Sequence, residues 1–452
     1  MMTKKQIWIN IISFSILPVA ILSVIPFPSP LTDIITNLQI TPLWWAVQSL
    51  TLLVLLYSSR AFFDINNTNN LRVLLLYLLW NIFCCIRGTF VADSYWVWKG
   101  LIGNSMLLFL PILAYTATNK VIVQSMMSYY IKYTLPLFAI FVLIVSTDAF
   151  GFFLIPISFL MLFFPVLTTR WRVLLGTVTL FVLLVDLDAR SNVIKFTVPI
   201  LLLSVYYLRK YILVKWMETV RLILIILPFM FFALAVSGVF NVFKMDTYIE
   251  GTFKEVKRDK AGNMVEYDLK TDTRTFLYME VLYSAKKYNS WWVGRSPARG
   301  NLSEAFGDED MTGRGERLTN EAAILNVFTW TGIIGLIFYF FVFYKASHIA
   351  INHSNNIFSK MLGLMIAFRW LYSWVEDVND FSLSYFMLWI MIGLCFSKSF
   401  RVMNNKEVTL WARGIFNKQQ RLATQKASKE KESETEEPVL ELINNMPSAR
   451  NN

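Results

Sequence analysis

The chain has 452 residues, of which 56% are hydrophobic and only 16% are charged, and its mean hydropathy is +0.49. Soluble globular domains carry about a quarter charged residues, so this composition excludes an ordinary soluble protein. The apolar residues come in runs close to the roughly 20 residues that a helix needs to cross a bilayer, which predicts a polytopic, all-α membrane protein.

Twelve apolar runs are candidate transmembrane helices. In chain order they cover residues 7–27, 42–58, 71–87, 100–117, 131–147, 149–168, 172–187, 192–212, 221–240, 321–344, 357–375 and 381–398. The first run follows Lys4 and Lys5 as a signal peptide would, but it is too long for a signal-peptide core, so we interpret it as an anchor. The chain therefore divides into nine helices in 1–240, a large loop at 241–319, three helices in 320–399 and a tail at 400–452.

The short loops carry their Lys and Arg residues mostly on one side of the predicted bundle. The opposite loops carry few, Arg87 and Lys99 among them. By the positive-inside rule, both termini are cytoplasmic and the 241–319 loop lies outside, which for a bacterial inner membrane means the periplasm. We attribute the net charge of +11 to the cytoplasmic rim facing anionic lipid rather than to a nucleic-acid partner.

The tail begins basic and aromatic, as SFRVMNNKEVTLWARGIFNKQQR, and continues as KASKEKESETEEPVLELI. The first part predicts a short helix on the membrane surface. The second has the low hydrophobicity and high charge that are typical of disordered segments.

The 241–319 loop is unlike the rest of the chain because it holds 13 basic and 13 acidic residues. Its DKAGN sequence, flanked by alternating residues, predicts a β-hairpin. Leu277, Val281 and Leu282 recur at helical spacing and predict a short amphipathic helix that starts near Thr273. The following WWVGRSPARGN ends that helix with Gly and Pro. Such a polar loop is where a membrane protein would handle a water-soluble substrate.

These motifs resemble those of the O-antigen ligase and polymerase family. An Arg opens the loop helix (Arg274), a Trp follows about 17 residues later (Trp291), and a Gly/Pro stretch comes next, similar to the family pattern R…W…NPxxGxG. The family continues with HNxxLxxLxxxGxxGL, where this chain reads NEAAILNVFTWTGIIGL. Aligning the two glycines puts Glu321 where the family His stands. In LDARSNVIKF, Arg190 matches the family's SR element. The resemblance covers residues 175–345.

The resemblance implies glycosyl transfer outside the membrane. The donor would be a glycan on a polyprenyl pyrophosphate, and the partners would be a glycan acceptor, the lipid bilayer and, as a further candidate, a chain-length regulator. It implies no metal or other cofactor. The residues agree, because Cys84, Cys85 and Cys395 fall in predicted spans and no Cys/His ligand spacing occurs.

Site residues follow from what the reaction requires. A departing pyrophosphate needs fixed positive charge, and the planar fork of Arg fits phosphate oxygens. We predict Arg274 and Glu321 as catalytic residues, with Glu321 as the base for the attacking hydroxyl. The predicted substrate-binding residues are Arg190, Arg295, Arg299 and Arg369.

Each of these residues also has an ordinary structural interpretation. Glu321 would suit the positive end of a helix capped by Thr319 or Asn320. Arg274 would pair on the surface with Asp272 or Glu280.

The substrate-binding candidates have such interpretations too. Arg190 would balance Asp186 and Asp188, and Arg295 and Arg299 would be solvated loop residues. Arg369, deep in a predicted span, would extend toward the interface.

Three functions fit this sequence. The first is a membrane glycosyltransferase that polymerises lipid-linked repeat units for O-antigen, capsule or exopolysaccharide. The second is a ligase that uses the same donor and transfers the glycan to lipid A core or to protein. The third is a polysaccharide transporter or flippase, which would also explain charges inside the membrane.

Overall fold

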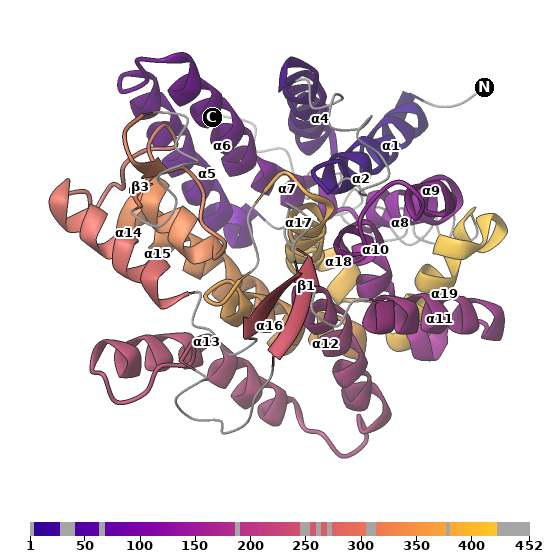
Figure 1. Ribbon diagram of the computed structural model, residues 1–452. Helices are drawn as coiled ribbons and strands as arrows, with labels where there is room; N and C mark the ends of the chain where they lie inside the picture. Colours follow the sequence, from indigo (N-terminus) through magenta and orange to yellow (C-terminus); the bar gives the residue numbers. More distant parts are fainter. Residues whose placement is uncertain are drawn as a thin grey trace, which may run out of the picture.

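The computed structural model is predominantly helical and describes residues 4–27, 41–62, 68–185, 190–244, 254–258, 264–268, 274–303, 313–376 and 380–422 (Figure 1). The second part of the tail, whose composition is typical of disorder, lies outside these residues.

Each run predicted before the large loop contains helix, although several helices end before the predicted run does. They are α1 (Lys4–Phe14), α2 (Ile16–Val24), α4 (Thr41–Phe62), α5 (Thr68–Thr89), α6 (Tyr95–Phe109), η2 (Leu110–Ile112), α7 (Leu113–Ala117), α8 (Lys120–Tyr129), η3 (Tyr130–Thr134), α9 (Leu135–Phe141), α10 (Asp148–Met161), η4 (Phe164–Val166), α11 (Thr169–Val185), α12 (Arg190–Tyr207) and α13 (Val214–Val236). The short η segments lie next to or contain Pro111, Pro136 and Pro165, each of which removes a helical hydrogen bond.

The loop and the C-terminal part contain β1 (Lys254–Arg258), β2 (Met264–Asp268), α14 (Thr275–Lys287), β3 (Asn301–Leu302), β4 (Glu316–Arg317), α15 (Ala323–Asn352), α16 (Ile357–Tyr372), α17 (Leu383–Phe396), α18 (Lys398–Arg401) and α19 (Asn405–Phe416). Strands β1 and β2 pair antiparallel, with Arg258 opposite Met264, on either side of the predicted DKAGN turn, which itself lies outside the described residues. The predicted loop helix is confirmed as α14.

Six helical segments among the described residues are long and apolar enough to cross a membrane. They are Lys5–Val24, Thr41–Phe62, Asn69–Thr89, Tyr95–Ala117, Val214–Val236 and Ala323–Asn352. Helices α10 and α17 are apolar but shorter. The class of an all-α protein with membrane-spanning helices is therefore supported, while the number of twelve spans stays a prediction.

Helix α17 forms the centre of the bundle, and each of its residues is buried. It packs against α7, α10, α15, α16 and α2, and Figure 1 shows it surrounded by the other helices. A helix enclosed by protein on all sides needs no polar face, which explains why this sequence is apolar throughout.

The bundle has two ends of different character. At the tail end, α19 begins with a capping box made by Asn404 and Glu407. Trp411 of α19 donates to the carbonyl of Lys120, and Gln124 of α8 donates back to the carbonyl of Trp411. The predicted tail helix therefore exists, but its apolar face packs on the protein. The loop end is where α5 and α13 finish and α15 begins.

Candidate functional site

The loop is attached to the bundle at a break inside α15. Gly332 there has a φ of 67° and a ψ of −170°, far from helical values. The backbone groups freed by the break bond to the loop: Ile333 N–H donates to the carbonyl of Trp291 at 2.8 Å, and Ile334 N–H donates to that of Trp292 at 3.2 Å. Buried backbone groups need hydrogen-bond partners. The carbonyls of the loop therefore satisfy the N–H groups that the break leaves without partners in the helix.

Two glycines make this attachment possible. A Cβ at Gly332 would lie 2.3 Å from the Trp292 carbonyl oxygen, and one at Gly294 would lie 2.6 Å from the backbone nitrogen of Gly332. Both glycines also have a positive φ, which other residues seldom adopt. Gly335 lies one turn further along α15, where a Cβ would meet Thr331 of the same helix and, at 3.0 Å, the ring of Trp80 in α5.

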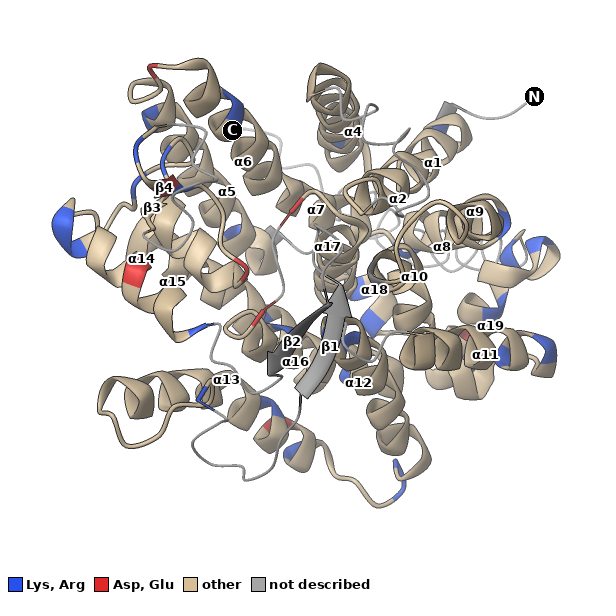
Figure 2. Cartoon of the chain, viewed as in Figure 1, with Lys and Arg blue, Asp and Glu red and all other residues tan. Residues whose placement is uncertain are grey.

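The docked loop forms a basic pocket of about 690 Å³ at the loop end. We define it by its described lining residues: Arg87, Val91, Tyr288, Ser290, Gly294, Arg295, Arg299, Arg314 and Glu316. Four of these are arginines, and Glu316 alone is acidic. Figure 2 shows charged segments of both signs beside β3 and β4.

Arg295 is the most constrained arginine of the basic pocket. Its N–H donates to the carbonyl of Thr329 in the broken helix, and its guanidinium donates to Glu316 at 2.8 Å and lies 3.7 Å from the centre of the Tyr288 ring. Arg299 lies 3.6 Å from the same Glu316 carboxylate. Two guanidinium groups thus share one carboxylate, which leaves the pocket with positive charge.

The other two arginines come from either side of the loop. Arg87, at the end of α5, donates to the carbonyls of Val293 at 2.7 Å and Gly294 at 2.8 Å. Arg314 pairs with Asp93, which follows α5. The pocket is therefore built jointly by the bundle and the loop.

A second cluster holds the two predicted catalytic residues. Arg274, the residue before α14, forms an ion pair with Glu321, and Arg317 lies 3.6 Å from the other oxygen of that carboxylate. Glu321 is 45% exposed, so its carboxylate remains accessible. Arg317 follows Glu316 in β4, and successive strand residues point to opposite faces. One peptide of β4 therefore connects this catalytic cluster to the basic pocket.

Neither Arg369 nor Arg190 lines the basic pocket. Arg369 is 1% exposed within α16, with its guanidinium 3.5 Å from the hydroxyl of Ser384. Lys195 of α12 is also buried and lies over the ring of Tyr372, one turn beyond Arg369. Arg190 is exposed at the start of α12. Buried cations at such positions are typical of functional or structural charge sites in membranes.

The structure thus brings together Arg274 with Glu321, and Arg295 with Arg299. Arg87, Arg314, Glu316 and Arg317 were missed as site residues, although Arg87 stood out as a basic residue in a loop that the charge bias places outside. Arg314, Glu316 and Arg317 belong to the loop, and Arg87 reaches it from α5 through hydrogen bonds to Val293 and Gly294, contacts that spacing in the sequence does not reveal.

One structural interpretation from the sequence is wrong. Helix α15 begins at Ala323 after Ala322, without a side-chain cap, so neither Thr319 nor Asn320 caps it. Asn320 instead bonds to Asn326 within the same buried turn. Arg274 pairs with Glu321 and Glu280 accepts a hydrogen bond from Ser303, while the predicted partner Asp272 lies outside the described residues.

The arrangement can bind an anion with several oxygens and hold a carboxylate next to it. Among the described residues, no group of three or more His, Cys, Asp or Glu could hold a metal ion. No family model, curated protein or solved structure matches the chain.

Proposed function

We propose that this protein is a membrane glycosyltransferase that polymerises oligosaccharide repeat units carried on a polyprenyl pyrophosphate. The observation that carries the proposal is the basic pocket, where Arg87, Arg295, Arg299 and Arg314 surround an open space beside the catalytic cluster. A pyrophosphate carries negative charge on several oxygens, and guanidinium groups match it with paired hydrogen bonds.

The catalytic cluster supplies the remaining chemistry. The acceptor sugar hydroxyl attacks the anomeric carbon of the donor, the bond from that carbon to the pyrophosphate oxygen breaks, and the lipid pyrophosphate leaves with the bonding electrons. The hydroxyl proton passes to Glu321, whose carboxylate is oriented by Arg274 and Arg317. The arginines stabilise the charge that develops on the leaving group.

In this proposal both termini are cytoplasmic and the loop end faces the periplasm of a bacterium with the protein in its inner membrane. The partners are the lipid-linked donor, the growing glycan acceptor and the bilayer, and a chain-length regulator would act on the same product. O-antigen, capsule and exopolysaccharide are the products that this reaction would serve.

A transporter is the second candidate, because discontinuous helices such as α15 form binding sites in many transporters. In α15, however, the freed groups of Thr329, Ile333 and Ile334 are bonded to loop backbone, and the Thr331 carbonyl accepts from Trp80. These groups are therefore engaged by protein rather than presented to a transported substrate, which favours the glycosyltransferase.

The test is deletion of the gene followed by gel analysis of surface glycans and of lipid extracts. We expect loss of the long glycan ladder with single repeat units remaining. Unattached long polymer would identify a ligase instead, and lipid-linked glycan trapped on the cytoplasmic side would identify a flippase.

Complementation then tests the site. Arg274→Ala and Glu321→Gln should each reduce long polymer by about 100-fold, the loss typical of removing one transition-state contact. The matched control is Arg209→Ala, an exposed residue whose guanidinium donates to the carbonyl of Tyr206 and lies over the ring of the same residue. A normal ladder in both site variants, with normal amounts of inserted protein, would refute the proposal.

A further inference from the structure

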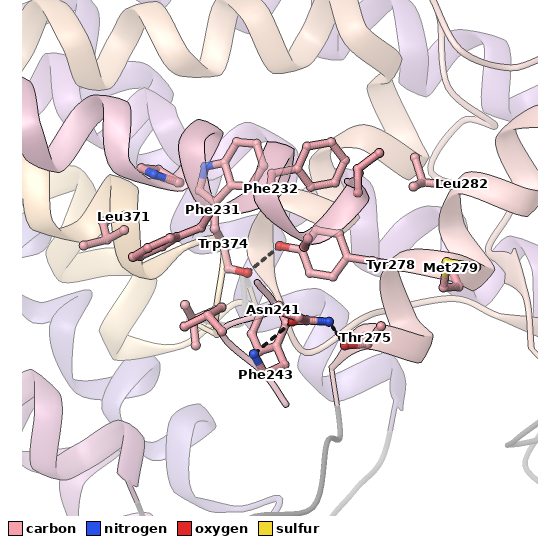
Figure 3. Close-up of a pocket in the computed structure, with 15 residues that line it drawn as sticks. Phe231, Phe232, Asn241, Phe243, Thr275, Tyr278, Met279, Leu282, Leu371 and Trp374 are labelled. Carbon is pink, nitrogen blue, oxygen red and sulfur yellow. Dashed lines mark hydrogen bonds between the residues drawn. The ribbon is translucent and has the colours of Figure 1, made fainter. Parts of the chain in front are cut away.

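An apolar groove of about 120 Å³ lies beside the catalytic cluster. Its walls come from the end of α13, the segment 241–243, the first turns of α14 and the end of α16. Figure 3 shows Phe231, Phe232, Tyr278 and Trp374 among the side chains that line it. An apolar cavity of about 150 Å³ stays dry and accepts hydrocarbon ligands, so water is not the natural occupant of such a site.

Apart from the buried indole N–H of Trp374, the side-chain polar groups described here are engaged with one another. Asn241 donates to the hydroxyl of Thr275 at 2.8 Å and accepts from the N–H of Phe243 at 3.0 Å. The hydroxyl of Tyr278 donates to the carbonyl of Trp374, and Figure 3 marks these bonds. The groove therefore presents hydrocarbon surface to its occupant and selects against a polar one.

The groove borders exposed apolar side chains of a candidate membrane-spanning helix. Helix α13, which forms one wall, is long and apolar enough to span a membrane, and it exposes Phe229, Met230 and Val236. Of the residues that line the groove, Val236 of α13 and Met279 of α14 are 70% and 64% exposed. A hydrocarbon chain in the bilayer can therefore enter the groove directly from the membrane.

A positively charged residue adjoins the groove. Arg274 immediately precedes Thr275 of the groove and pairs with Glu321. Its charge also reaches Tyr278: burial raises the pKa of this phenol, and the positive charge of Arg274 opposes that rise. An apolar chain ending at a guanidinium matches a lipid whose head is a phosphate.

We propose that this groove holds the polyprenyl chain of the donor, at the isoprene units nearest the pyrophosphate. The proposal rests on the proposed function, because it assigns the lipid part of the same substrate. The chain would fix the direction in which the pyrophosphate meets Arg274 and the basic pocket, so that the groove selects lipid-linked sugars over soluble sugar phosphates.

The test uses the full-length protein in phosphatidylcholine nanodiscs and a photoactivatable geranylgeranyl diphosphate. Ala235 lines the groove, whereas Ala233 is exposed and does not line it. We expect labelling of peptides within 228–243 or 275–282. Ala235→Phe should lower this labelling by about tenfold because it fills the groove, and Ala233→Phe should leave it unchanged.

Competitors identify the occupant. Unlabelled geranylgeranyl diphosphate should displace the probe, while inorganic pyrophosphate and phosphatidylglycerol should not. Equal displacement by phosphatidylglycerol would make this an ordinary lipid groove, and labelling that Ala235→Phe does not change would place the chain elsewhere; either result overturns the proposal.

The glycan ladder separates this proposal from the proposed function. If deletion abolishes the ladder and Ala235→Phe supports a normal one, the groove assignment fails while the enzyme assignment stands. If the groove is labelled as expected and deletion leaves the ladder intact, the enzyme assignment fails and the groove still binds isoprenoid diphosphates.

Discussion

Arginines at the two ends of the bundle are held in opposite ways. At the tail end, Arg221 of α13 is 0% exposed and bonds to both oxygens of Glu218, at 2.6 and 2.8 Å. It also lies within 3.4 Å of the Tyr344 carbonyl and 3.3 Å of the Ser347 hydroxyl on α15. At the loop end, Arg295 and Arg299 share one carboxylate at the edge of a large pocket.

The difference indicates which charges serve folding and which serve binding. Arg221 joins two helices, and its contacts are supplied by the protein. The loop-end arginines outnumber the carboxylates that line their pocket, so an anion from outside can complete their contacts. Burial alone would not separate the two cases, because Arg295 is only 8% exposed.

The largest effect should come from breaking the attachment of the loop. Gly332→Ala places a Cβ against the Trp292 carbonyl in a positive-φ conformation, which should lower the free energy of unfolding by about 3 kcal/mol or more. Thermal unfolding in detergent and proteolysis of the 241–319 loop measure this. Gly176→Ala in α11, where a Cβ meets only ordinary contact, is the matched control. Equal stability of the two variants would contradict the attachment described here.

Arg221→Ala should have the next largest effect and lower the free energy of unfolding by about 3 kcal/mol. Removing one partner of a buried ion pair leaves Glu218 without its counter-charge. The amount of long glycan on the gel should fall only in proportion to the amount of folded protein. Adding Glu218→Gln should restore part of the stability. A ladder defect larger than the loss of protein would give Arg221 a role in function and remove the contrast between the ends.

Arg299→Ala should show the opposite of Arg221→Ala, with little loss of stability and a large loss of long polymer. Its pair with Glu316 is 3.6 Å long and part of a pocket rim, so thermal stability should change by less than about 1 kcal/mol. Long polymer should nevertheless fall by about tenfold or more, through weaker contact with the leaving group. Glycan gels and thermal unfolding of the same preparation measure the two effects. Loss of stability with normal polymer would make Arg299 a structural residue like Arg221.

Tyr278→Phe should have the smallest effect, about 1 kcal/mol of stability, because it leaves the Trp374 carbonyl without its donor while keeping the ring in the groove. Tyr283→Phe, on the exposed side of α14, is the control and should change stability by less than about 0.5 kcal/mol. A larger loss of stability for Tyr283→Phe than for Tyr278→Phe would mean that contacts on the exposed face of α14, rather than those in the groove, hold this helix in place.

Periodicity and composition predicted much of this fold. The apolar runs coincide with helices, and Leu277 and Val281 are buried in α14 as their spacing predicted. The break at Gly332 was not predicted, because a lone glycine in an apolar run is equally compatible with close helix packing. The break depends on Trp291 and Trp292, far away in the chain, which supply the carbonyls.

The site was predicted only in part for the same reason. Local motifs pointed to Arg274, Arg295 and Arg299, which belong to one stretch of the loop. Arg87 joins them through long-range hydrogen bonds to Val293 and Gly294. The pairing of Arg274 with Glu321 was likewise hidden, because nearer acidic residues offered simpler partners.

The short ladder of β3 and β4 has a consequence for how the two charged groups are coordinated. Among the described residues, Asn301 pairs with Arg317 and Leu302 with Glu316, and Ser303 N–H donates to the carbonyl of Gly315. A strand can slip only by whole residues, and a slip of one reverses which side chain faces which side. Such a slip would exchange a carboxylate and a guanidinium between the basic pocket and the catalytic cluster at once. The same short pairing of β3 and β4 therefore fixes the position of Glu316 beside Arg295 and that of Arg317 beside Glu321.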